Sequence, residues 1–316
     1  MHSRSGIVAV AVLLAATLLD ATPTPAQVPP DGGRVPTLPR PPAAVAARQD
    51  PPVELPGGGR VLFPGRRLVA LYGHPGAPSL GVLGEQGLAA AVRRAEQVAR
   101  PYRALSTVPV VPSFEIIATV AQRSAGSDGD YSAESSVASL RPWVEAAGRH
   151  GMLVLLDLQP GRAGLLDQAV RYAELLRLPH VGLAVDPEWK LGRHQRPLRQ
   201  IGSIDAAEIN RTSAWLASLV RADDLPQKLF VVHQFRLSMI GHEARLRTDH
   251  PELALLVHMD GQGGAGQKLA TWRSVRAARP DGARLGWKNF YDEDHPMFSP
   301  ARTMARQPQP VMISYQ

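Results

Sequence analysis

The chain has 316 residues, a net charge of +7 and no cysteine. The lack of cysteine excludes disulfide bonds, so a hydrophobic core must hold the fold together. The positive charge comes almost wholly from arginine, and the sequence has no strongly basic helix and no aromatic–basic repeat. We therefore expect no dedicated binding of nucleic acid.

The first 60 residues lack the pattern of a folded domain. A short basic start, an apolar stretch over residues 7–19 and a small-residue exit predict a secretory signal peptide over residues 1–26. The apolar stretch is shorter than the ~20 residues that a membrane span needs. Residues 27–60, rich in Pro, Ala and Gly, predict a disordered spacer. We expect a secreted protein with no transmembrane segment and no lipidated cysteine, whose single folded domain covers residues 61–316.

Short apolar runs alternate with amphipathic segments along this domain. The predicted strands cover residues 68–72, 110–120, 152–158, 181–185, 229–235, 253–259, 284–291 and 310–315. The predicted helices cover residues 86–98, 136–149, 163–176, 206–220, 237–246, 265–277 and 300–306. This alternation predicts an α/β fold with a parallel sheet, and eight units in about 250 residues are typical of a (β/α)8 TIM barrel. The sequence stops after the eighth strand, so we expect the eighth helix to be missing.

The candidate functional residues follow from the predicted strand ends. Barrel enzymes build their active sites at the carboxyl ends of the strands. The polar and aromatic residues at these ends are Tyr72, His74, Glu115, Asp157, Gln159, Asp186, Glu188, Trp189, His233, Gln234, His258, Asp260, Lys288, Tyr291, Asp292 and Tyr315. A purely structural barrel has no reason to bury so many, because each unpaired polar group costs kilocalories. We expect them to meet in one cavity.

Asp186 and Glu188 end the fourth predicted strand, with a proline between them. Residues at i and i+2 of a strand share a face, so both acids should point into the barrel with Gly182 and Ala184. Cleavage of a glycosidic bond needs a carboxylic acid and a facing carboxylate. Glu188 is the candidate acid, and Asp186 would raise its pKa by like-charge repulsion.

The facing carboxylate would be Asp260, Asp157 or Asp292. In the alternative reading, Asp186 and Glu188 only cap the following loop or pair with its arginines.

The remaining polar candidates have two readings each. Glu115, in the middle of a strand, is either a deep ligand or base, or an acid paired with a neighbour such as Lys288. His74, His233 and His258 could form a metal cluster with Asp260, but the first strand lacks a His-x-His pair. We expect no metal and no cofactor, and assign these histidines to substrate hydroxyls or to positioning of the acids.

Two further features suit a glycan. Aromatic residues at the strand ends, including Trp189 and Tyr291, would pack against sugar rings. The loop over residues 190–199 carries one lysine and three arginines beside the proposed acids. It is either an ordinary solvated loop or a grip for an anionic substrate. Residues 124–134 would form a mobile flap over the same cavity.

With this architecture and an Asp-x-Glu at Asp186 and Glu188, the chain resembles secreted barrel glycoside hydrolases of the chitinase and barrel-lysozyme types. The resemblance implies that Glu188 donates the proton and that Asp186 positions the substrate. The aspartates that precede this pair in chitinases are Gly182 and Ala184 here, and the Asn-Glu of the largest retaining clan is absent from this strand.

The sequence thus predicts a secreted hydrolase that cleaves a carbohydrate polymer, an anionic or N-acetylated glycan of the cell envelope. It does not determine the oligomeric state, for which a monomer is the default. The alternatives are a non-catalytic glycan-binding barrel and a metal-dependent hydrolase.

Overall fold

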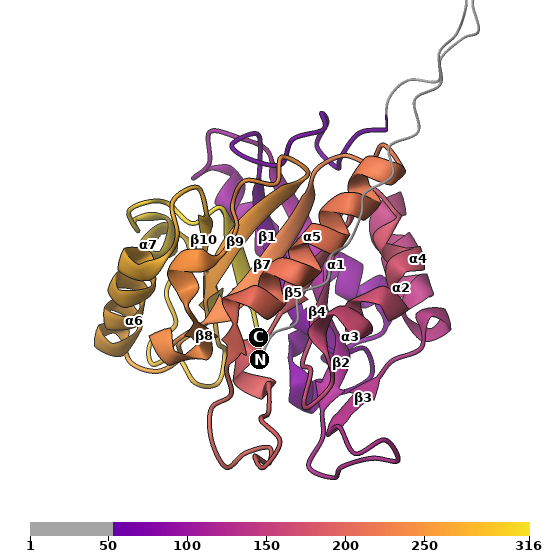
Figure 1. Cartoon of the computed structure of the whole chain (residues 1–316). Coiled ribbons are helices and arrows are strands. Elements are labelled where there is room, and N and C mark those ends of the chain that lie inside the picture. The colour runs from indigo at the N-terminus through magenta and orange to yellow at the C-terminus, as the bar shows by residue number, and fades with distance from the viewer. Residues whose placement is uncertain (1–52) are drawn as a thin grey trace, which may run out of the picture. The chain divides into compact units, whose positions relative to one another are not determined.

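The computed structural model describes residues 53–316, and their architecture is a closed barrel of parallel strands with helices outside (Figure 1). The barrel strands are β1 Arg67–Gly73, β2 Val110–Ala121, β4 Leu153–Leu158, β5 Val181–Val185, β7 Lys228–Gln234, β9 Leu253–Met259, β10 Arg284–Asn289 and β11 Met312–Tyr315. Each pairs in parallel with its neighbours, and β1 closes the barrel by pairing with both β11 and β2. The predicted TIM-barrel fold is confirmed.

Helices fill most of the connections between these strands. They are α1 Leu88–Arg103, α2 Val137–Arg149, α3 Leu165–Arg171, α4 Ala173–Leu176, α5 Ala206–Ala222, α6 Ala265–Ala278 and α7 Pro300–Met304. The predicted helix over residues 163–176 is divided into α3 and α4 at Tyr172. In the described part of the chain, no helix follows β11.

The predicted helix over residues 237–246 is wrong. Two short 3-10 turns, Leu237–Met239 and Glu243–Arg245, flank a two-residue strand, β8 Ile240–Gly241, which pairs with β6 Ile204–Asp205. Glycine is a poor helix former, and the next residue, His242, has a φ of 54°, which no α-helix contains.

Side chains of the strands alternate between two cores. On β5, Val181, Leu183 and Val185 belong to the core between barrel and helices, whereas Ala184 belongs to the interior core, as the alternation predicted. The interior core fills the half of the barrel at the amino-terminal ends of the strands, and Leu55, Leu62 and Phe63 complete it. The polar candidates therefore lie closer to the carboxyl-terminal ends of the strands than this apolar core.

The predicted signal peptide and residues 27–52 of the predicted spacer lie outside the described residues. Of residues 53–60, Leu55 is buried, and Arg60 forms an ion pair with Asp224. No helix within residues 53–316 is long and apolar enough to cross a membrane.

Two loops project from the end of the barrel where the strands finish. One follows β2 and leads to the short antiparallel strand β3 Ser132–Glu134, and the other follows β5 (lower edge of Figure 1). The loop after β5 contributes Ile201 to the wall of the candidate site.

Candidate active site

A cavity of about 550 Å³ opens at the carboxyl ends of the barrel strands. Its wall contains seven of the predicted site residues, namely Tyr72, Gln159, Asp186, Glu188, Trp189, Asp260 and Lys288. Polar groups from β1, β4, β5, β9 and β10 therefore converge there, as expected for an active site in this fold.

Asp186 and Glu188 both line this cavity, although Glu188 does not belong to the strand. The strand β5 ends at Val185, and Pro187–Trp189 form a 3-10 turn. Proline at the start of this turn cannot donate to the sheet, which ends the strand there. The turn, rather than the alternation of a strand, directs Glu188 into the cavity.

Burial and neighbouring charges raise the pKa values of both acids. The pKa of Glu188 rises to about 7, because of burial and then of the like charge of Asp260. The pKa of Asp186 lies well above its usual value because of burial and the charge of Glu188. The sequence predicted Asp186 as the neighbour that raises the pKa of Glu188, whereas Asp260 is the main one.

Asp260 behaves in the opposite way. Burial alone would raise its pKa, but the hydrogen bond from His233 lowers it. The Nδ1 of His233 lies 3.1 Å from Asp260 Oδ2. With a pKa of about 7, Glu188 keeps its proton through the weakly acidic range, in which Asp260 is ionised.

His233 connects two carboxylates below the cavity. Its Nε2 donates to Glu115 Oε1 over 3.0 Å while its Nδ1 donates to Asp260. Although burial opposes the charge, these two carboxylates hold the pKa of His233 well above its usual value. Glu115 is thus paired with His233 rather than with Lys288, and His233 positions Asp260.

Asp157 and Tyr72 form a second pair beside this network. The Tyr72 hydroxyl donates to Asp157 Oδ2 over 2.9 Å, and burial raises the pKa of Asp157 to about 6. Asp157 is fully buried and does not line the cavity. Asp260 is therefore better placed than Asp157 to face Glu188.

Lys288 supplies a positive charge at the cavity wall. Its Nζ lies 3.5 Å from the centre of the Tyr72 ring, a cation–π contact. Its charge opposes the rise in pKa at Glu188 and Asp157.

His258 lies in the barrel but does not line the cavity. Its Nε2 hydrogen-bonds with Ser314 Oγ at 2.7 Å, and burial lowers its pKa well below the usual value. A Cβ on Gly286 would lie 2.0 Å from its Nδ1, so only glycine leaves room for this neutral ring.

Four other predicted residues lie outside the cavity. Gln234 points away from the interior and donates from Nε2 to Glu243 Oε2 over 2.9 Å. The Tyr315 hydroxyl lies 2.6 Å from that of Tyr102, in the core between barrel and helices. Tyr291 and Asp292 are exposed beyond the end of β10.

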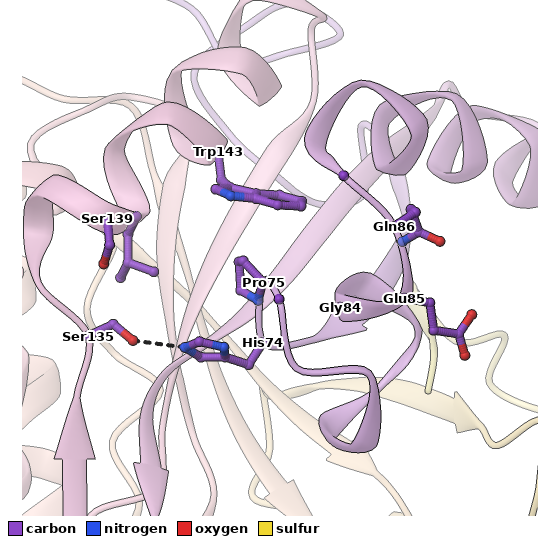
Figure 2. A pocket seen from close by; sticks show the side chains of 11 residues that line it. His74, Pro75, Gly84, Glu85, Gln86, Ser135, Ser139 and Trp143 are labelled. Atoms are coloured by element: carbon purple, nitrogen blue, oxygen red, sulfur yellow. Dashed lines mark hydrogen bonds between the residues drawn. The ribbon is translucent and has the colours of Figure 1, made fainter.

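His74 lines a different pocket, of about 590 Å³, beside α1 and α2 (Figure 2). Its Nε2 hydrogen-bonds with Ser135 Oγ at 3.0 Å, beneath the Trp143 indole. The chain turns away from the barrel axis at Gly73, whose φ of 145° and close contact with Gly81 suit only glycine.

Sequence reasoning missed Phe235, Arg236 and Phe290 in the cavity wall. Gln262 and Glu293, which also line it, are polar residues after the sixth and seventh predicted strands that were not assigned a role. Phe235 and Phe290 directly follow β7 and β10, but the predicted strands ran one and two residues too far. Both give the cavity apolar surface beside its acids.

Within residues 53–316 no group of three or more His, Asp or Glu side chains has a geometry suited to a metal ion. No known protein family matches the sequence, and no curated protein is significantly similar to it.

Proposed function

We propose that the protein is a glycoside hydrolase in which Glu188 is the general acid and Asp260 the facing carboxylate. The observation that carries this proposal is the pairing of these two acids in one cavity with opposite shifts in pKa. Glycosidic cleavage needs one protonated and one ionised carboxyl group at the same pH, and here one environment provides both.

In the proposed reaction Glu188 donates its proton to the glycosidic oxygen, and the bond from that oxygen to the anomeric carbon breaks. Asp260 stabilises the positive charge that develops on the sugar. Water supplies the hydroxyl group of the new reducing end, and the remaining proton of this water returns to Glu188, which restores the acid. His233 positions Asp260 through its hydrogen bond. Asp186 is a further carboxyl group in the same cavity wall as Glu188. Trp189, Phe235 and Phe290 provide apolar surface for sugar rings.

The proposal includes secretion, which rests on the leader pattern of residues 1–26. A carbohydrate polymer outside the cell would then be the substrate. Amino-terminal sequencing of the protein recovered from culture medium tests this part, and a mature terminus near residue 27 is expected.

Release of reducing ends from a panel of bacterial-envelope and plant polysaccharides tests the proposed activity. We expect release by the wild type, and a loss of at least a hundredfold in Glu188→Gln and in Asp260→Asn. The matched control is Asp292→Asn, because this acid is exposed and does not line the cavity; it should keep wild-type activity. Equal release by wild type and Glu188→Gln would contradict the assignment. Binding of a polysaccharide without release by any variant would favour a non-catalytic glycan-binding barrel.

A further inference from the structure

A second cavity, of about 440 Å³, adjoins the candidate active site. The two cavities share Glu188, Trp189, Ile201 and Arg236 in their walls. A polymer bound across both would therefore pass Glu188, with one sugar unit on each side of it. The second cavity is completed by Leu198, Arg199 and Gln200, which belong to the loop after β5.

The ends of this loop are fixed beside Glu188. Its first part is held by Lys190, whose Nζ lies 2.8 Å from Glu208 Oε1. Its last part returns at Gly202, whose N–H donates to the carbonyl of Glu188 over 2.7 Å. A Cβ on Gly202 would lie 2.1 Å from the Lys190 carbonyl, so the chain can close here only with glycine. Arg199, three residues before Gly202, lines the same cavity as Glu188.

Arg199 and Arg236 line the second cavity from two different loops. Within residues 53–316 neither guanidinium forms an ion pair or a side-chain hydrogen bond, whereas Lys190 of the same loop is paired. Both arginines are exposed to solvent. Two unpaired guanidinium groups beside a carbohydrate cavity suit an anionic group, because each offers a planar fork of donors that matches a carboxylate.

Apolar residues complete this cavity. Leu198 is 65% exposed and has a φ of 60°, a backbone conformation that leucine rarely adopts. Ile201 is also exposed, and Trp189 lies in the shared wall. Exposed apolar side chains of this kind suit the apolar face of a sugar ring, and strained residues are frequent where a ligand is held.

We infer that the polymer contains sugars with carboxylate groups. Arg199 and Arg236 bind the carboxylate of the sugar unit next to the glycosidic bond whose oxygen Glu188 protonates. This inference rests on the proposed function for the position of the cleaved bond. The recognition of the carboxylate itself needs no turnover.

Binding to the Glu188→Gln protein tests the inference without cleavage. The probes are oligomers of galacturonic acid, of mannuronic and guluronic acid, of hyaluronan and of peptidoglycan glycan, each compared by calorimetry with its carboxyl-reduced form. We expect at least one carboxylated probe to bind tenfold or more tighter than its reduced form. Adding Arg199→Gln and Arg236→Gln should remove this difference. The matched control adds Arg193→Gln and Arg196→Gln, which lie on the same loop outside both cavities, and should preserve it.

Equal affinity for every carboxylated probe and its reduced form would overturn the inference, as would absence of binding to the whole panel. Retention of the preference without Arg199 and Arg236 would also overturn it. Preferential binding that depends on these arginines, in a wild type that releases no reducing ends, would support the carboxylate site while contradicting the proposed hydrolase.

Discussion

Glu188, Asp186 and Asp260 line one cavity, but their surroundings raise the pKa values of the first two and lower that of Asp260. Burial raises the pKa of Glu188 to about 7 and that of Asp186 well above its usual value, while the hydrogen bond from His233 lowers the pKa of Asp260. The lowered pKa of Asp260 depends on His233, which is itself held in its charged form by Glu115. The buried network below the cavity is therefore part of the proposed site.

The raised pKa of Glu188 also predicts how this residue affects stability. Its pKa rises from 4.5 to about 7 on folding, so between these values the folded state holds a proton that the unfolded state has released. The free energy of unfolding should therefore fall as the pH rises through this range. We therefore compare the free energies of unfolding of Glu188→Gln and the wild type at two pH values. Between pH 4 and pH 8 this difference should shift by roughly 3 kcal/mol in favour of the variant.

Urea unfolding of both proteins at the two pH values measures this difference. Asp292→Asn serves as the control and should follow the wild type. The same free-energy difference at both pH values would show that Glu188 releases its proton normally in the folded protein.

At the residue scale, the sequence predicted that Asp186, Glu188 and Asp260 meet in one cavity, but not their hydrogen-bond partners. Asp186 and Asp260 directly follow apolar strands, and Glu188 lies two residues beyond Asp186. Parallel strands bring their ends together. The pairing of Glu115 with His233 joins residues 118 positions apart, and only the register of the closed barrel determines it. Gln234 was misjudged because a single position along β7 changes which side of the barrel a residue faces.

At the element scale, the barrel strands were predicted closely because each is a continuous apolar run. Their ends were less certain, and this is why Phe235 and Phe290 were missed. The turn Pro187–Trp189 and the loop that follows it have no apolar periodicity, so their role in directing Glu188 was visible only in the structure. Gly202 closes this loop and determines where it returns.

Gly202→Ala tests that role. Its Cβ would lie 2.1 Å from the Lys190 carbonyl and 2.6 Å from the Glu188 carbonyl, so the loop has to move. We expect a loss of about 1–3 kcal/mol in stability, together with at least a tenfold loss in the release of reducing ends.

Gly192→Ala is the matched control in the same loop. Its nearest contact would be Gln195 Oε1 at 3.4 Å, an ordinary packing distance. Wild-type stability and activity in Gly202→Ala would refute the proposed dependence of Glu188 on this loop closure.

At the scale of the whole molecule, the barrel interior is apolar at the amino-terminal ends of the strands and polar at their carboxyl-terminal ends. Leu62 is fully buried in the apolar half, at the end of the barrel opposite the proposed site. We expect Leu62→Ala to lose about 2–5 kcal/mol of stability, with an unchanged pH dependence of activity while the protein remains folded.

Thermal unfolding and the pH profile of activity measure the two effects. Val61→Ala is the control, because Val61 is 59% exposed and should contribute little. An altered pH profile in Leu62→Ala would mean that the two halves are not independent.

The measurement that tests the central claim most directly is the pH dependence of turnover, on the polysaccharide from which the wild type releases most reducing ends. Glu188 must be protonated and Asp260 ionised, so the rate should decline as the pH rises through about 7 and also fall in strong acid. The residual rate of Glu188→Gln should lack the alkaline decline. A wild-type rate that keeps rising above pH 8, or an alkaline decline unchanged in Glu188→Gln, would contradict Glu188 as the general acid.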